Sequence, residues 1–178
     1  AVWAAILLII FHAVAKALLF IAVGSAEHSI GSRDIEDMEG LIKRRPKTAL
    51  AILIGIAGMF LAPFGMLISK WAAIEALMQS HPILPVMVAF GSSATLFFWA
   101  KWMGKILSTV KGTPPPHGPV SNEEKLAMLG LVILTVALCA CWPLISSISI
   151  KPYLLANYGE AVELNRATVI IMSIMLAL

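Results

Sequence analysis

The apolar stretch from Thr48 to Met78 constrains the fold of this chain more than any other feature. As one straight helix, its roughly 30 residues would measure about 45 Å, whereas the hydrocarbon core of a bilayer is about 30 Å thick. The stretch also contains Pro63 and, shortly after it, Gly65. Proline removes a backbone donor and clashes with the preceding turn, and glycine tolerates the dihedral angles that follow. The sequence therefore predicts a transmembrane helix that is broken near Pro63–Gly65.

The overall composition is that of an integral membrane protein. Hydrophobic residues make up 60% of the chain and charged residues 13%, whereas soluble domains have about half and about a quarter. Both chain ends, Ala1 and Leu178, lie inside apolar runs without an initiator Met or a basic signal region. We therefore expect an internal piece of a longer polypeptide.

Apolar runs and helix breakers together predict an all-α, polytopic transmembrane helix bundle. Residues 1–110 form its core, with three membrane crossings of which the middle one is broken. Residues 111–122 form a Pro-rich linker, and residues 123–178 add C-terminal transmembrane helices, the second of them truncated. The expected helices cover 2–24, 48–78, 82–107 and 121–150, with a capping box at Ser121 and Glu124, a kink at Pro143, and a last helix from Ala167. We also expect a short surface helix over 34–41 and an interfacial or extramembrane segment over 151–166.

The loop charges predict the orientation. Lys and Arg are concentrated in the loops 25–47 and 108–122, which lie on one side of the membrane if the broken helix counts as one crossing. The positive-inside rule makes that side cytoplasmic. A net charge of +3 in such a chain indicates orientation and not nucleic-acid binding.

Lys70 is the first candidate functional residue, because it lies about 12 Å from the end of its apolar run at 1.5 Å per residue. A charged ammonium at that depth must face water, pair with an acid or lose its proton. Glu75 is the acidic residue on the same helix, but a five-residue offset turns it about 140° away. The alternative is a side chain that bends out to the headgroups.

His12 and Lys16 form a second candidate site, since residues four apart lie on one face of a helix. An imidazole and an ammonium one turn apart disfavour each other's charged form, so the pair is suited to hold and pass on a proton. The alternative for His12 is a structural role. Lys101 either snorkels to the interface or lines a pore, and His28 is a solvated candidate just past the first helix.

No site has the spacing of metal ligands, and no phosphate loop, Ser/His/Asp signature or cysteine cluster is present. Redox or hydrolytic catalysis within this chain is therefore not expected.

The runs His12-Ala-Val-Ala-Lys16-Ala-Leu-Leu-Phe20, Gly31-Ser-Arg-Asp-Ile35 and Ala62-Pro63-Phe64-Gly65, followed by Ser69-Lys70-Trp71, carry a family resemblance. They resemble the antiporter-like subunits shared by respiratory complex I, Mrp-type cation/proton antiporters and energy-converting membrane-bound [NiFe] hydrogenases. PFGMLISKW and LFFWAKWMGKIL look most like the large subunit of Ech-type, group 4 hydrogenases.

The resemblance implies two inverted five-helix repeats, of which this chain would contain the second. Lys70 would be the terminal ionisable residue of the proton path, where relatives have Lys or Glu, and His12 and Lys16 would belong to the polar chain leading to it. Glu75, Lys101 and His28 are further candidates for the path or for pairing. The chain itself would hold no cofactor; [NiFe] and iron–sulfur clusters would lie in partner subunits of a multisubunit complex in a prokaryotic cytoplasmic membrane.

Three hypotheses follow for function. The first is a subunit that translocates H⁺ or Na⁺ in a redox-driven complex. The second is a subunit of an Mrp-type Na⁺/H⁺ antiporter, driven by ion gradients alone. The third is a structural membrane anchor.

Overall fold

The computed structural model describes residues 2–60, 65–78, 81, 83–109 and 118–159, and these residues contain helices and loops but no strand. The all-α fold is therefore confirmed. Three helical spans in the described part are long and apolar enough to cross a membrane: Val2–Ile30, Ile83–Leu107 and Asn122–Tyr158. In chain order the elements are α1 (Val2–Ile30), the 3₁₀ turn η1 (Glu36–Met38), α2 (Leu41–Arg44), α3 (Pro46–Phe60), α4 (Gly65–Met78), α5 (Ile83–Leu107), α6 (Asn122–Ile145), the π-helical turn η2 (Ser146–Ile150) and α7 (Lys151–Tyr158).

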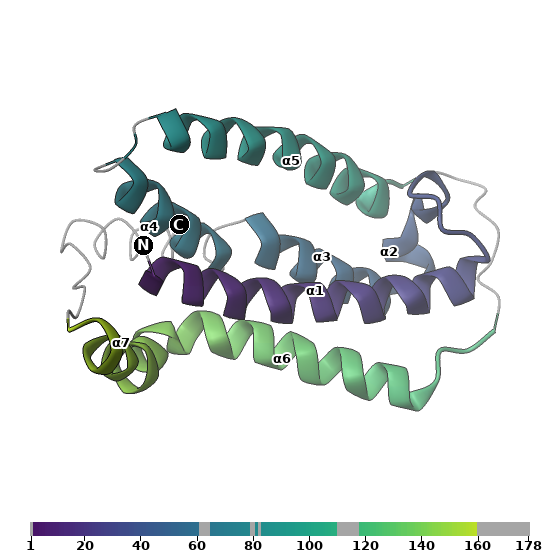
Figure 1. Ribbon diagram of the computed structural model, residues 1–178. Helices are drawn as coiled ribbons and strands as arrows, with labels where there is room; N and C mark the ends of the chain where they lie inside the picture. The colour runs from purple at the N-terminus through teal and green to yellow at the C-terminus, as the bar shows by residue number, and fades with distance from the viewer. Residues whose placement is uncertain (1, 61–64, 79–80, 82, 110–117, 160–178) are drawn as a thin grey trace.

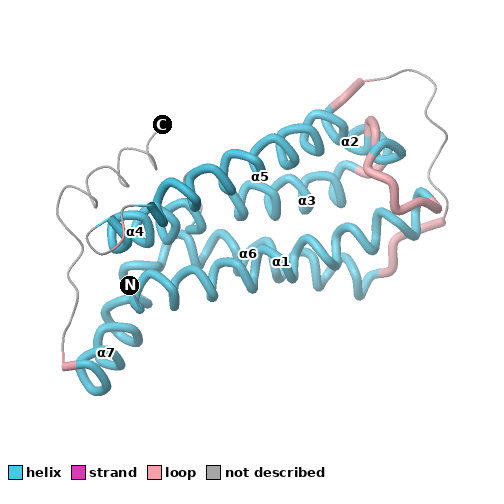
Figure 2. The backbone as a smooth tube through the Cα atoms, turned by 45° about the horizontal axis from the view of Figure 1, so that its top comes forward, coloured by secondary structure: helices cyan, strands magenta, loops and turns pink. Residues whose placement is uncertain are grey.

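Helix α1 is the central element, with α3, α4 and α6 packed along it (Figures 1 and 2). Small residues allow the closest approach. A Cβ placed on Gly55 of α3 would lie 2.8 Å from Cγ of Leu19, and one on Gly58 would lie 3.2 Å from Cβ of Ala15. Both distances are so short that only glycine fits without displacing its neighbour. The glycines therefore fix how α3 lies against α1.

The long apolar stretch forms two helices, α3 and α4 (Figure 1). Helix α3 ends at Phe60 and Gly65 is the first residue of α4, whereas Pro63 lies outside the described residues. The two helices pack in different places. Buried residues of α3 join a cluster near the loop end of the bundle, and Met66 and Ala72 of α4 join a second cluster with the first turns of α1. The sequence prediction of a discontinuous helix is thus met by two separately packed segments.

The first loop is shorter than predicted, because α1 continues beyond Gly24 to Ile30. Ser25, Glu27 and His28 are polar but compatible with a helix, so the end of the apolar run did not mark the end of the helix. Gly31 terminates it, with φ of 79° and its N–H donating to the carbonyl of Glu27 at 2.7 Å. The prediction of a loop over 25–47 was wrong for its first six residues, and α2 and the start of α3 occupy its end.

The predicted surface helix over 34–41 is instead two short pieces, η1 and α2. Gly40, with φ of 68°, separates them because the left-handed conformation interrupts a right-handed helix. The Gly40 N–H donates to the carbonyl of Lys105 at 3.0 Å, and an Arg45 N–H donates to the carbonyl of Gly118. These bonds bring the two basic loops to the same end of the bundle (Figure 1).

The C-terminal part also differs from the prediction. The Ser121 side chain accepts from the Glu124 N–H at 3.1 Å, so Ser121 caps α6 as the sequence indicates. The helix passes through Pro143, widens into the π-helical turn η2 and continues as α7. Residues 151–158 are therefore helical and continuous with α6, contrary to a separate extramembrane segment. The helix predicted from Ala167 lies outside the described residues.

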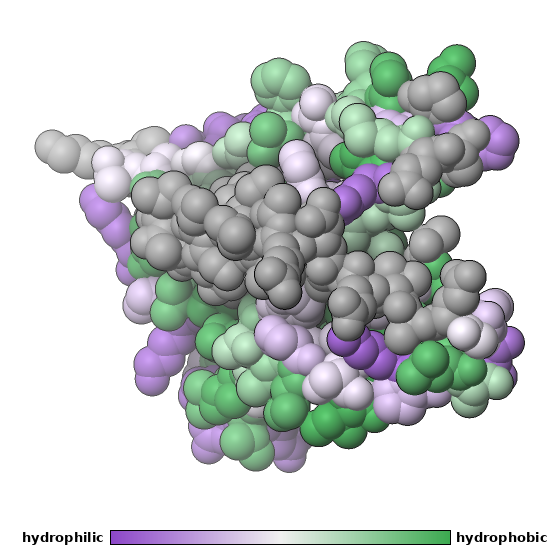
Figure 3. All heavy atoms as spheres, turned by 90° about the vertical axis from the view of Figure 1, so that its left-hand side faces the viewer, coloured by the Kyte–Doolittle hydropathy of each residue, from purple (hydrophilic) through white to green (hydrophobic). Residues whose placement is uncertain are grey.

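The outer faces of the bundle are apolar. Viewed from the end that carries α7, green hydrophobic side chains form patches at the top, over α5, and at the bottom, over α6 and α7 (Figure 3). Phe90 and Phe97 of α5 are 78% and 77% exposed, and Leu126 of α6 is 72% exposed. Such surfaces are unusual on a soluble monomer and are expected where lipid or a neighbouring protein covers them.

Candidate functional site

His12 and Lys16 lie halfway along α1, at the level where α3 ends. Their neighbour Ala15 faces Gly58, which is close to the last residue of α3. The same glycine faces Thr135 of α6, because a Cβ placed on Gly58 would lie 3.5 Å from Cγ2 of the threonine. Both His12 and Lys16 are half-buried. The structure thus brings the two polar residues of α1 to the interruption between α3 and α4.

The Lys16 ammonium lies 6.0 Å from the centre of the Trp99 ring of α5. Trp99 is buried and stacks on Trp102, with ring centres 5.7 Å apart and 20° between the planes. An ammonium at this distance from a ring face is attracted by the ring quadrupole. Sequence reasoning assigned these tryptophans to an interfacial belt. Their three-residue spacing, which puts both rings on one helix face, was the signal for a buried aromatic pair.

Lys70 lies on α4, past the interruption, and is half-buried. The adjacent Ser69 is fully buried and its hydroxyl donates to the carbonyl of Met66 at 3.1 Å. Met66 in turn packs in the cluster that contains Phe11 of α1. Within the described part of the chain, Lys70 makes no ion pair. Glu75 is also half-buried, one and a half turns further along the same helix.

The structure separates the remaining candidates from this site. Lys101 lies at the loop end of α5, where its ammonium is 2.8 Å from a Glu36 carboxylate oxygen. That ion pair fits the interfacial alternative for Lys101 and not the pore-lining one. His28 is exposed in the last turn of α1, inside the helix and not past it.

His28 borders a polar cavity of about 280 Å³ between the end of α1 and the start of α6. Ser25, Ser29 and Glu124 also line it. The Ser25 hydroxyl oxygen is buried and has no hydrogen-bond partner among the described residues. A polar cavity of this size can hold water, which would satisfy such a hydroxyl.

Glu36 is the residue that ties the first loop to α5, and sequence reasoning missed it. Its second carboxylate oxygen lies 2.6 Å from the Lys105 ammonium. Hydrogen bonds from Lys101 and then Lys105 lower the pKa of Glu36 from about 4.5 to about 2. Because the pKa is lower in the folded state, the stabilisation is complete above about pH 4.5 and is lost as the pH falls toward about 2.

This geometry gives a direct test. We expect ¹³C NMR of the Glu36 carboxyl group to report a pKa near 2 in the folded protein, and a value closer to the ordinary one when Lys101 and Lys105 are both replaced by Gln. Replacing Lys43, which takes no part in this cluster, should leave the Glu36 titration unchanged. A wild-type pKa near 4.5 would contradict the ion-pair geometry.

Comparison with known proteins identifies the family. Residues 1–97 match the transmembrane family described as "NADH:quinone oxidoreductase/Mrp antiporter, TM". The chain belongs to this family. The matched region of this antiporter family contains α1, both segments of the interrupted helix, and therefore His12, Lys16 and Lys70.

Curated relatives agree with this assignment. The chain is 32% identical over 141 residues to hydrogenase-4 component B of Escherichia coli, an alignment that covers 72% of this chain and 20% of that protein. It is 32% identical over 140 residues to a Na(+)/H(+) antiporter subunit of Alkalihalophilus pseudofirmus, covering 72% and 17%. It is 26% identical over 165 residues to formate hydrogenlyase subunit 3 of Escherichia coli, covering 86% and 26%. The chain thus spans about a fifth of the length of the curated relatives that it matches.

Proposed function

We propose that this chain is part of a membrane subunit that translocates ions. The observation that carries the proposal is the position of Lys16 and Lys70, two half-buried cationic residues on either side of the point where a membrane helix is interrupted. Placing an ammonium within the hydrocarbon core costs at least about 2.5 kcal/mol, so such residues are rare unless they serve an ion path. Interrupted helices are a recurrent place for such paths.

In the proposed path, His12 and Lys16 hold a proton beside the interruption and Lys70 receives it on the other side. One turn of helix separates the imidazole from the Lys16 ammonium, so a proton on either disfavours a proton on the other. Trp99 keeps the Lys16 ammonium against an aromatic face when it is charged. The polar cavity beside His28 and Ser25 supplies water at the loop end of α1. We propose that this end faces the cytoplasm of a prokaryotic cell, as the basic loops favour.

Among the ways to drive such a path, we propose redox coupling within a multisubunit complex. The hydrogenase-4 and formate hydrogenlyase relatives favour it, and any [NiFe] and iron–sulfur clusters would then lie in partner subunits. The Na(+)/H(+) antiporter relative favours the second candidate, exchange driven by ion gradients alone. Iron–sulfur or [NiFe] subunits that purify with the full-length protein would support the first. Their absence, together with Na⁺-dependent proton exchange, would support the second.

Replacement of Lys16 by Ala tests the proposal against a purely structural role. We expect the intact complex carrying this variant, reconstituted in vesicles with an internal pH-sensitive dye, to lose most of its proton translocation. The reason is that alanine can neither bind a proton nor contact Trp99. Replacement of Lys43, an exposed lysine of α2 at the loop end, serves as the control. Unchanged translocation in the Lys16 variant would favour the membrane anchor.

A further inference from the structure

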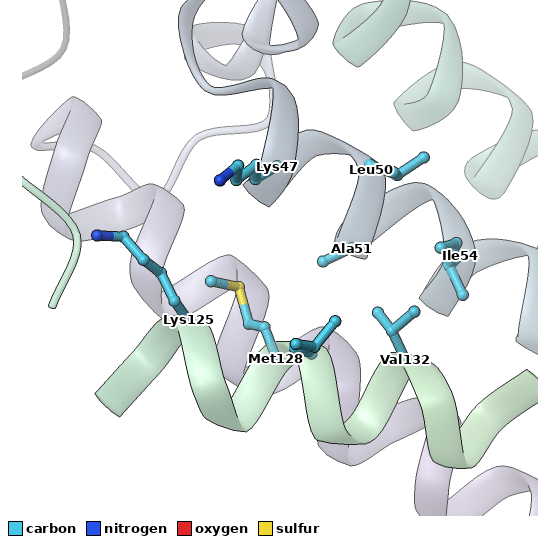
Figure 4. A pocket seen from close by; sticks show the side chains of 8 residues that line it. Lys47, Leu50, Ala51, Ile54, Lys125, Met128 and Val132 are labelled. Atoms are coloured by element: carbon cyan, nitrogen blue, oxygen red, sulfur yellow. The ribbon is translucent and has the colours of Figure 1, made fainter. Parts of the chain in front are cut away.

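A groove between α3 and α6 opens at the loop end of the bundle (Figure 4). Its volume is about 310 Å³ and its walls are almost entirely apolar. Figure 4 shows Ala51 and Ile54 of α3 on one side and Met128 and Val132 of α6 on the other. The groove runs from the loop end toward the middle of the membrane, because Ile54 lies about 10 Å along α3 from Lys47.

The mouth of the groove is basic. Lys47 and Lys125 lie together at one end, with both ammonium groups on the same side (Figure 4). A second pocket of about 250 Å³ shares these two lysines and adds Arg44 and Arg45. The described lining of the two pockets thus contains four basic residues and no acidic one. The Lys125 ammonium donates to the neutral Asn122 side chain at 3.2 Å, so its charge stays available to an anion.

The arrangement combines two features that one class of molecule satisfies. A cluster of positive charges at the membrane surface attracts a phosphate, and an apolar channel that continues into the bilayer accepts a hydrocarbon chain. A soluble anion would gain nothing from the apolar walls. A neutral lipid would gain nothing from the lysines.

We propose that this groove, lined by Lys47, Leu50, Ala51, Ile54, Lys125, Met128, Leu129 and Val132, is a binding site for an anionic phospholipid. The headgroup phosphate lies between Lys47 and Lys125 and one acyl chain lies between α3 and α6. The lipid thereby bridges the helix before the interruption and the helix that follows the Pro-rich linker. The site is separate from His12, Lys16 and Lys70, so it does not depend on the proposed ion path.

Photolabelling of the full-length protein in its complex tests the site. The complex is reconstituted in phosphatidylcholine nanodiscs that contain a trace of photoreactive phosphatidylglycerol, and labelled peptides are mapped by mass spectrometry. We expect labelling of α3 and α6 along the groove. Replacing Lys47 and Lys125 together by Gln should lower that labelling at least threefold, and Val132→Phe should lower it by filling the channel.

The control is the double variant Lys43→Gln with Lys151→Gln, which removes the same charge outside the groove. It should label like the wild type, and the melting temperatures of all variants should agree. Equal labelling by photoreactive phosphatidylcholine would overturn the preference for an anionic headgroup. Competition by millimolar inorganic phosphate would assign the lysines to a free anion instead. Absence of label from the groove, or its crosslinking to a partner protein, would show that protein and not lipid fills it.

Discussion

Replacement of Lys70 by alanine is expected to abolish ion translocation while electron transfer in any partner subunits continues. The ammonium is half-buried on α4, past the interruption, and makes no ion pair among the described residues. Alanine removes the proton-binding group without disturbing Ser69 or Met66, whose contacts hold α4 against α1. In vesicles with an internal pH-sensitive dye, the signal should fall to that of protein-free vesicles.

Two further variants sharpen this prediction. Lys70→Glu should retain measurable translocation, since a carboxylate can also bind and release a proton, and the family resemblance implies Lys or Glu at this place. Lys151→Ala, which removes a lysine at the start of α7, should translocate like the wild type. Normal stoichiometry in Lys70→Ala would rule out Lys70 as a member of the path.

The second large effect concerns the packing of α3 on α1. Gly55→Leu is expected to destabilise the bundle by about 3 kcal/mol or more, at or beyond the upper end of the range for overpacked cores. The cause is that even a Cβ at this position would lie 2.8 Å from Cγ of Leu19, which is itself buried. Unfolding of the purified full-length protein, titrated with denaturing detergent and followed by tryptophan fluorescence, would measure the loss.

Gly130→Leu is the matched control for this effect. Gly130 lies within α6, and a Cβ placed there would meet nothing within 4 Å. Leucine should therefore be tolerated or slightly stabilising, because it has a higher helix propensity than glycine. If both variants unfolded at the same detergent fraction, the contact between Gly55 and Leu19 would not limit the stability.

The sequence allowed the main architecture to be predicted because the governing signals are local. The length of the apolar stretch together with Pro63 and Gly65 predicted the division into α3 and α4, and the expected helix over 82–107 agrees closely with α5. The Ser121 cap was likewise readable from its spacing to Glu124. For the candidate site, the four-residue spacing placed His12 and Lys16 on one face of α1.

The features that were missed depend on contacts between distant segments. The end of α1 is set by the left-handed conformation of Gly31 and not by the last apolar residue. The approach of Lys16 to Trp99 needs α5 to lie beside α1, and 83 residues separate the two in sequence. The ion pairs of Glu36 likewise join residues whose proximity only the folded bundle creates.

Helix α1 runs unbroken from Val2 to Ile30, whereas α3 ends and α4 begins beside its middle. Consequently, no shared ladder of backbone hydrogen bonds carries a displacement of α4 into α3. A rotation of α4 about its own axis would change the surroundings of Lys70 while the Gly55–Leu19 contact and the loop-end ion pairs stayed in place. The smallest unit that could switch access to the lysine is thus a segment of 14 residues, supported on a strut that need not bend.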